Sequence, residues 1–500
     1  MSKNHFVVKT IRWFFVGINL TFLVIFDPSM SKDAYHTLPG PKGLPVLGNI
    51  HQVTVDKLHQ DLEKWAEQFG LIYKLQLGPS QLVVITDPDI IQEILKNRPH
   101  LFRRMEKMDQ IMQEEGVYGV FNAEGEEWGA HRKLIAQGLD IKHQQHYFPA
   151  ILTTTQRLLT KWSALAKEGS SFDIQKDLMR FTVDVTTSLA FGYEMNTIEK
   201  GEDVIQNHLE KIFPIIFKRI NAPIPLWRFY KNKQDRAFDH ALLAINKLVD
   251  EFIEKGKETL LNHPEFKENP RNLLEAILVA AEEDHTIDNM AIRGNLLTIL
   301  MAGEDTTAHT VAWMIYFLCL HPEYQEKIRE EAKEYINDGV ITDYQQLPSL
   351  KLLEAFAYET MRLKPVAPLL LFEPLEDVEV KGHRFSKGRR LLIESRYATS
   401  LDENFTHAQE FRPERWLRKE SKCPYSEHQV KAFIPFGSGP RFCPGKNLAM
   451  LEIKMMVAML VTNFKVELVT PAHEIEEVMA FTMMASPYQV KLTSIKKPQS

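Results

Sequence analysis

The feature that most constrains the fold is a long apolar segment in the middle of the chain, from Met290 to Leu320. Its apolar residues recur every three to four positions, which predicts one continuous helix. The helix should end at His321, because Pro322 pushes the residue before it out of the helical region. At a rise of about 1.5 Å per residue, such a helix is roughly 45 Å long. We therefore expect it to cross the whole folded domain.

Other helices and a few short strands should pack around this segment. The remaining elements follow from helical periodicity in other segments, from alternation of apolar and polar residues near the start of the chain, and from strand-rich segments near its end. There is no internal repeat and no break in composition after Leu38, so we expect one mainly α domain with small β-sheets. The expected elements are helices over 151–165, 237–253 and 273–281, a hairpin over 72–85, and strand-rich segments over 378–393 and 478–492.

The first 31 residues differ in composition from the rest of the chain. Residues 13–26 are almost entirely apolar and follow three basic residues, and as a helix they would reach roughly two-thirds of a ~30 Å hydrocarbon core. No small-residue cleavage pattern follows, so the segment does not resemble a removed signal peptide. We expect residues 1–31 to attach the protein to a membrane, with the folded domain in the cytoplasm. The alternative is that they pack on that domain.

The folded part then divides into a short connection and one domain. Residues 32–48 include Leu38-Pro39-Gly40-Pro41, which cannot form a helix and predicts a stiff hinge. Residues 49–500 form the single domain. A net charge of −6 without a long basic run argues against nucleic-acid binding. The three cysteines contain no CxxC pair, so neither a disulfide framework nor a cysteine-rich zinc site is expected.

The strongest chemical signal is the segment Phe436 to Gly445, FGSGPRFCPG. Three glycines and two prolines around Cys443 prescribe a tightly turned loop whose backbone amides can approach the sulfur. A helix predicted over 448–464 begins just behind the loop, and its positive N-terminal end favours a thiolate. A lone cysteine is ordinarily a small buried hydrophobe. The surrounding loop favours a chemical role.

This loop resembles the haem-binding signature of the cytochrome P-450 superfamily, Phe-x-x-Gly-x-Arg-x-Cys-x-Gly, at every fixed position. The resemblance implies that Cys443 ligates the iron of haem b, that Arg441 pairs with a haem propionate, and that Phe436 belongs to the cofactor site. Trp128 and Arg132 match the superfamily's WxxxR, which contacts a propionate. On a helix they share one face. Taken alone, they would be a packed tryptophan and a solvated arginine.

A second resemblance joins two segments some fifty residues apart. Glu359 and Arg362 stand at i and i+3 of a predicted helix and can form an ion pair. Arg415 lies in the later segment Phe411 to Trp416. The three are similar to the superfamily's structural triad, which ties this helix to the loop before the cysteine. The implied role is architectural.

The long helix carries a polar interruption from Ala302 to Thr307, where buried polar groups need partners. The segment resembles the superfamily's oxygen-activation motif, which implies that Thr306 supplies a hydroxyl and Asp305 an acid for proton delivery. Glu304 is the alternative acid, although it should point about 100° away. Gly303 would let a flat cofactor approach the backbone. The alternative for Thr306 is a hydroxyl that only bonds back to a helix carbonyl.

The resemblance implies a haem-thiolate monooxygenase. Such an enzyme inserts one atom of O2 into an apolar substrate, with electrons from a separate donor, either an NADPH-dependent reductase or a ferredoxin system. No flavin or nicotinamide domain follows Ser500, which fits a separate donor. The rivals are a haem-thiolate isomerase without O2, a peroxide-driven hydroxylase and a non-catalytic haem sensor. The first tends to lose the acid and alcohol pair retained here, and the second needs an arginine-proline element that is absent.

Two further expectations concern the pocket and its surroundings. Many superfamily members carry a propionate-binding arginine in the segment that here reads Leu369 to Pro374, which contains none. Residues 212–230 combine apolar, aromatic and basic side chains and either enter a membrane interface or pack in the core. The residues expected to line the substrate pocket are Val366, Ala367, Leu369, Phe481, Met483 and the segment 105–120.

Overall fold

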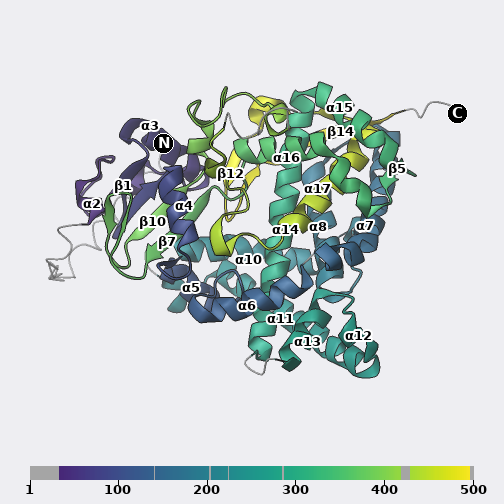
Figure 1. Ribbon diagram of the computed structural model, residues 1–500, viewed down its shortest axis with the longest axis horizontal. Helices are drawn as coiled ribbons and strands as arrows, with labels where there is room; N and C mark the ends of the chain where they lie inside the picture. Colours follow the sequence, from purple (N-terminus) through teal and green to yellow (C-terminus); the bar gives the residue numbers. More distant parts are fainter. Residues whose placement is uncertain are drawn as a thin grey trace, which may run out of the picture.

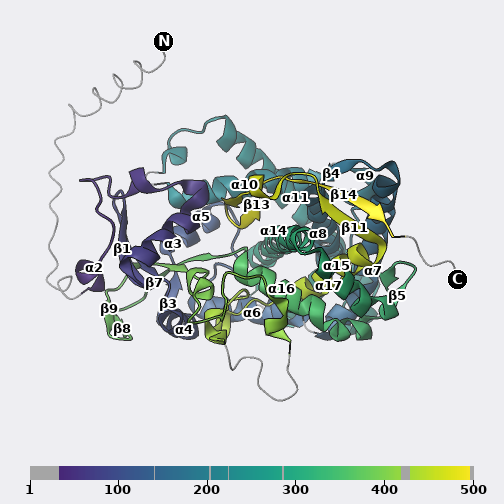
Figure 2. The ribbon, with the colours of Figure 1, turned by 90° about the horizontal axis from the view of Figure 1, so that it is seen from above.

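The computed structural model describes residues 33–139, 141–201, 204–222, 225–283, 287–417 and 428–495. The long central helix is α14 (Asn289–Leu320), which runs through the middle of the domain in Figure 1 and is seen nearly end-on in Figure 2. The Asp288 side chain caps its start by accepting from the Ala291 amide, and it ends at His321 before Pro322. The predicted helix and its C-terminal end are confirmed.

Helices surround α14 on several sides, which explains why it is apolar all round. The most extensive packing is against α8 (Ile174–Phe191), and α11 (Lys233–Asn262), α16 (Lys351–Leu363) and α17 (Lys446–Asn463) also contact it. The other helices are α2 (Ala34–Thr37), α3 (Leu58–Phe69), α4 (Pro88–Lys96), α5 (Glu106–Glu114), α6 (Gly125–Gly138), α7 (Ile141–Glu168), α9 (Thr197–Lys200), α10 (Val204–Asn221), α12 (Glu265–Glu268), α13 (Leu273–Glu283) and α15 (Pro322–Ala332).

The largest sheet has five strands in the order β1-β2-β10-β7-β3 and lies to one side of the helices (Figure 1). The predicted hairpin forms its edge, with Ile72 opposite Ile85, and β10 runs parallel to β2. These strands are β1 (Ile72–Leu77), β2 (Ser80–Ile85), β3 (Phe102–Arg104), β7 (Leu369–Pro374) and β10 (Arg390–Glu394). Smaller sheets pair β4 (Ser171–Asp173), β11 (Phe464–Leu468) and β14 (Gln489–Ser494); β5 (Ile336–Asn337) and β6 (Val340–Ile341); β8 (Val378–Val380) and β9 (His383–Phe385); and β12 (Glu477–Met479) and β13 (Met483–Ala485).

The proline-rich segment near the start is packed against this sheet. The Lys74 amide of β1 donates to the carbonyl oxygen of Pro39 at 2.8 Å. A Cβ atom on Gly40 would lie 2.2 Å from the Lys74 carbonyl oxygen, so only glycine allows this approach. The segment is therefore fixed to β1 where we expected a hinge. Residues 1–31, expected to attach to a membrane, lie outside the described residues, and among the described helices none is long and apolar enough to span one.

Candidate active site

Cys443 lies in the turn between the 3-10 helix Gly439–Arg441 and α17. Its amide donates to the carbonyl oxygen of Phe436 at 2.9 Å, which closes the loop. Gly439 has a φ of +69°, and a Cβ atom there would lie 2.4 Å from the Leu95 carbonyl oxygen of α4. A side chain at position 439 would therefore separate the loop from α4, which explains one of the glycines in the motif.

The thiol of Cys443 faces groups that favour its negative form. Burial is the larger effect and raises the pKa of this thiol overall, while hydrogen bonds from the amides of Gly445 and Lys446 and the positive charge of Arg132 act in the opposite direction. The two amides belong to the start of α17, as the sequence predicted. Cys319 is the other free thiol among the described residues, and Cys423 lies outside them.

Arg441 and Trp128 meet next to the cysteine loop. The Arg441 guanidinium lies 4.9 Å from the centre of the Trp128 ring and is buried. It donates to Glu124 Oε1 at 2.7 Å and to the carbonyl oxygen of Ala123. The structure thus brings two residues of the predicted cofactor site together, and it adds a carboxylate that the sequence interpretation missed.

Two more arginines, the buried Arg98 and the partly buried Arg104, lie beside the same carboxylate. Arg98 donates to Glu124 Oε1 at 3.2 Å, and the backbone amide of Arg104 donates to it at 2.9 Å. Arg104 Nε donates to the Phe121 carbonyl oxygen at 2.8 Å. Arg104 is the last residue of β3 and pairs with Phe372 of β7, within the segment that lacks the superfamily arginine. Nothing in the local sequence marked these residues, because they come from separate segments.

The charge of this cluster fits a bound anion. The guanidinium groups of Arg98 and Arg441 share the Glu124 carboxylate, while Arg104 contacts it through its backbone amide. Burial lowers the pKa of all three arginines, and repulsion by neighbouring arginines lowers each pKa further. Arg98 Nε, Arg441 Nε and Glu124 Oε2 have no hydrogen-bond partner among the described residues. Unpaired charge in a buried site is costly. The two propionates of a haem would supply the missing negative charge, so these residues and Cys443 together fit that cofactor.

The predicted polar residues of α14, Glu304, Asp305 and Thr306, follow one another along the helix. The Thr306 hydroxyl donates to the Ala302 carbonyl oxygen at 2.9 Å, the back-bonded geometry that was our alternative for this residue. Its oxygen still has lone pairs that can accept a proton or a hydrogen bond. Asp305 is partly accessible, with 16% of its side chain exposed, whereas Glu304 is 1% exposed. The accessible acid of the two is Asp305.

Gly303 has a different neighbour from the one we expected. A Cβ atom at this position would lie 2.7 Å from Oγ1 of Thr186 on α8. The glycine therefore allows α8 and α14 to pack closely, and the expected approach of a cofactor to the backbone at residue 303 stays a prediction. The sequence shows that a close approach takes place but not which neighbour makes it.

Glu359, Arg362 and Arg415 form a buried ion-pair cluster. Glu359 accepts from Arg362 Nε at 3.0 Å and Nη2 at 2.7 Å, and from Arg415 Nε at 3.0 Å. Trp416 Nε1 and the Arg412 amide donate to it as well, both at 2.9 Å. The remaining Arg362 protons go to backbone carbonyls of residues 399, 408 and 410. The cluster ties α16 to the segment before the cysteine loop.

The expected pocket residues come from both ends of the chain. Met483 is fully buried, and its amide donates to the Val366 carbonyl oxygen at 2.8 Å. The Phe481 ring lies 6.2 Å from that of Phe121, which in turn stacks 3.9 Å below the Arg104 guanidinium. These aromatic rings therefore adjoin the arginine cluster. Val366 and Phe481 are each partly exposed, as expected of residues beside a pocket.

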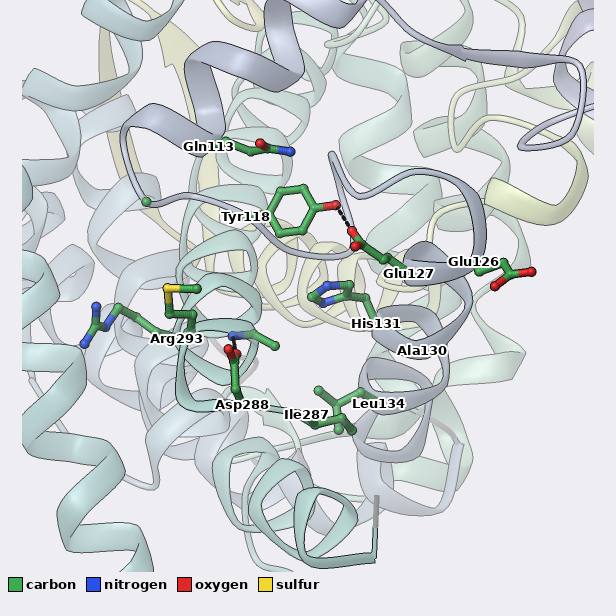
Figure 3. A pocket seen from close by; sticks show the side chains of 13 residues that line it. Gln113, Tyr118, Glu126, Glu127, Ala130, His131, Leu134, Ile287, Asp288 and Arg293 are labelled. Atoms are coloured by element: carbon green, nitrogen blue, oxygen red, sulfur yellow. Dashed lines mark hydrogen bonds between the residues drawn. The ribbon is translucent and has the colours of Figure 1, made fainter. Parts of the chain in front are cut away.

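Figure 3 shows a separate cavity of about 680 Å³ between α6 and the first turns of α14. Tyr118 donates to Glu127 on one side, and Arg293 of α14 lies on the other. Arg293 precedes Thr306 by 13 residues, or about 20 Å along the helix axis. The cavity is therefore distinct from the site at Cys443, and the sequence did not predict it.

The loop around Cys443, with the start of α17 behind it and an arginine cluster beside it, is the arrangement expected of a haem-thiolate site. A family model described as Cytochrome P450 matches residues 38–492. The chain belongs to the cytochrome P450 family.

Individual relatives are distant but cover most of the chain. Protein LUTEIN DEFICIENT 5, chloroplastic, of Arabidopsis thaliana is 25% identical over 489 residues, which cover 95% of this chain and 79% of that protein. Cytochrome P450 3A15 of Cavia porcellus is 26% identical, with 85% of each chain covered. Cytochrome P450 734A6 of Oryza sativa subsp. japonica is 27% identical, with 81% and 76% covered. The chain is accordingly a haem-thiolate monooxygenase that uses haem b, O2, a hydrophobic substrate and a separate redox partner.

Proposed function

We propose that Cys443 is the thiolate ligand of the haem iron. The observation that carries this assignment is the loop itself, in which the Gly445 and Lys446 amides and the Arg132 charge converge on the sulfur. Each of these groups stabilises a negative sulfur and disfavours the neutral thiol. The bound haem supplies O2 activation with electrons from the partner, while the protein supplies position, protons and an apolar pocket.

The propionates are assigned to the buried arginines. The Arg441 guanidinium lies over the Trp128 ring, whose indole N–H is a further donor, and the Arg104 guanidinium lies over Phe121 nearby and is repelled by Arg441. Arg132, one turn after Trp128 on α6, is half-buried and close enough to Cys443 to affect its pKa. These residues would hold the cofactor by its carboxylates.

Proton delivery is assigned to Thr306 and Asp305. The Thr306 hydroxyl is held by the Ala302 carbonyl, so its oxygen has a fixed position on the side of the helix. Such a hydroxyl can pass a proton only if it is resupplied, and the partly exposed Asp305 carboxylate is the adjacent acid. A positioned acid or base contributes about 10²–10⁴-fold in rate.

The ligand assignment is tested by the absorption spectrum of the dithionite-reduced protein with carbon monoxide. The wild type should show the strongly red-shifted Soret band of a thiolate-ligated haem. Cys443→Ser should lack it. The matched control is Cys319→Ser, because Cys319 is also a free thiol. It lies at the C-terminal end of α14, where its thiol contacts the carbonyl oxygen of Val466 in β11. An unchanged band in Cys443→Ser, or its loss in Cys319→Ser, would refute the assignment.

We also propose that the protein sits on a membrane surface, with the monooxygenase domain in the cytoplasm. Three apolar or aromatic residues after α10 are strongly exposed: Leu226 is 65% exposed, Phe229 84% and Tyr230 73%. The isoleucines of α10 at positions 212, 216 and 220 are buried. The segment 212–230 thus has a packed helix, as one expectation required, and an exposed apolar end that supports the proposed membrane contact. Exposed aromatic side chains beside basic ones suit a membrane interface.

Membrane attachment is tested by sedimentation with vesicles of phosphatidylcholine and phosphatidylserine. The triple variant Leu226→Ser, Phe229→Ser, Tyr230→Ser should pellet less than the wild type. Leu261→Ser is the control, because Leu261 is 77% exposed at the end of α11. Deletion of residues 1–31 tests the N-terminal segment separately. Equal pelleting of all variants would exclude both attachments.

A further inference from the structure

One turn after Asp305, α14 carries a buried histidine whose role the mechanism above does not include. His309 is 6% exposed, and its Nε2 lies 3.9 Å from Oδ1 of Asp305. Residues at i and i+4 share a helix face, so the two side chains are held as neighbours by the backbone. A hydrogen bond of about 2.9 Å requires the pair to close by about 1 Å, which a small side-chain rotation achieves.

The surroundings of His309 fix its chemical form. Burial lowers the pKa of its imidazole to about 4, so the ring is neutral near pH 7. A neutral imidazole has one nitrogen that donates and one that accepts. Nδ1 is buried and has no hydrogen-bond partner among the described residues. The tautomer with its proton on Nε2 therefore directs its N–H at the Asp305 carboxylate.

A packing role alone explains His309 poorly. The residues around it on α14 include Ala308, Val311, Ala312 and Trp313, and an apolar side chain at position 309 would bury without a polar penalty. A buried polar ring is favourable only if it makes a polar contact, and the Asp305 carboxylate lies 3.9 Å from Nε2 of the ring.

We propose that His309 is a positioning residue for the Asp305 carboxylate during proton delivery through Thr306. This inference rests on the proposed role of Asp305. An aspartate side chain has about three χ1 rotamers, and only one can face a given neighbour. A donor that fixes the productive rotamer raises its population at most about threefold. The effect of His309 is therefore smaller than the direct effect of Asp305.

The test uses the haem-loaded full chain with a surrogate NADPH reductase and no added substrate. The measured quantities are NADPH consumed, hydrogen peroxide released, and the ratio of rates in H2O and D2O. His309→Leu, which removes the donor, should raise the ratio of peroxide to water formed from O2, calculated from peroxide released and NADPH consumed, by up to about threefold and show a larger solvent isotope effect. His309→Gln, which retains an N–H donor, should restore values near the wild type. Should the leucine variant fail to load haem, His309→Met supplies the same comparison.

A double-mutant cycle separates a positioning role from a local disturbance. In the Asp305→Asn background, His309→Leu should have no further effect, because the group it positions is gone. Thr298→Val is the matched control: Thr298 is another buried polar residue of α14, bonded to the Gly294 carbonyl oxygen, and its replacement should change neither measured quantity.

The outcomes distinguish the inference from the proposed function. If Asp305→Asn changes peroxide release while His309→Leu does not, the positioning role is refuted and the role of Asp305 stands. Additive effects in the cycle refute it as well. If Asp305→Asn itself has no effect, both the acid role and the inference fall. In each case the reduced carbon monoxide spectrum reports separately on the ligation by Cys443.

Discussion

Removing the charge of Glu359 should destabilise the domain strongly, although this residue touches no reacting atom. Its side chain is completely buried and accepts five hydrogen bonds, from Arg362, Arg415, Trp416 and the Arg412 amide. Glu359→Gln conserves the volume. If the new amide oxygen takes the Oε1 position, its NH2 group faces the Arg362 Nε and Trp416 Nε1 donors that now bond to Oε2.

Two independent routes give the same magnitude. Each unsatisfied buried donor costs about 1–3 kcal/mol, and two donors lose their acceptor. Removing one partner of a buried ion pair costs about 3–5 kcal/mol. The free energy of unfolding should therefore fall by about 3–5 kcal/mol, which at about 1.4 kcal/mol per tenfold lowers the folded to unfolded ratio by a factor between about a hundred and a few thousand.

Pulse proteolysis of the haem-loaded protein across a urea series measures this change. The matched control is Glu414→Gln, because Glu414 lies next to Arg415 and accepts from Tyr324 and Lys327, but 49% of its side chain is exposed. An exposed pair contributes up to about 1 kcal/mol. If the two variants lost equal stability, burial of the ion-pair cluster would not be the source of its strength.

Three further predictions concern a pH-dependent ion pair, a close helix contact and the cofactor. Burial alone would raise the pKa of Glu477, but the hydrogen bond from His59 and the nearby cations hold it well below its usual range. Glu477→Gln should therefore be less stable than the wild type at pH 7. Urea unfolding should show this difference shrinking as the pH falls below about 4.3, the ordinary pKa of an unfolded glutamate. Gly294→Ala places a Cβ 1.7 Å from the Tyr118 carbonyl oxygen and should cost about 1–3 kcal/mol in thermal unfolding. Arg104→Leu should release haem to apomyoglobin about tenfold faster or more, since hydrogen bonds to charged groups contribute about 1.5–3 kcal/mol; an unchanged rate would remove Arg104 from the cofactor site.

Local patterns predicted the elements of this fold better than their ends. α14 was readable because apolar periodicity and Pro322 mark its length. α7, expected over 151–165, begins at Ile141 and continues through Pro149. Its first turns were not predicted from the sequence, because they carry polar residues without a periodic apolar stripe. Position 464 was expected to end the last helix, but Phe464 opens β11 by pairing with Ser494 of β14. That pairing partner lies 30 residues away, so tertiary contact decides the boundary.

The candidate site shows the same division. Cys443, Arg441 and Trp128 were found from motifs in which the spacing itself carries the information. Glu124 and Arg104 were not, because their roles arise only when β3 and the start of α6 meet beside the cysteine loop. The available signal was indirect: a missing arginine in β7 implied that another cation had to balance the site.

The missing arginine also shows what the sheet contributes to the site. β3 and β7 are neighbours, with Arg104 opposite Phe372, so side chains of the two residues lie at the same edge of the proposed cofactor site. The Arg98 guanidinium lies 4.4 Å from the Phe372 ring, and the ring itself adds no charge. A site that must bind two carboxylates requires a sufficient positive charge at that edge, but not from a particular strand. We therefore infer that Arg104 of β3 and Arg98, which follows α4, supply the positive charge that β7 lacks. Haem retention in Arg104→Leu measures this contribution directly.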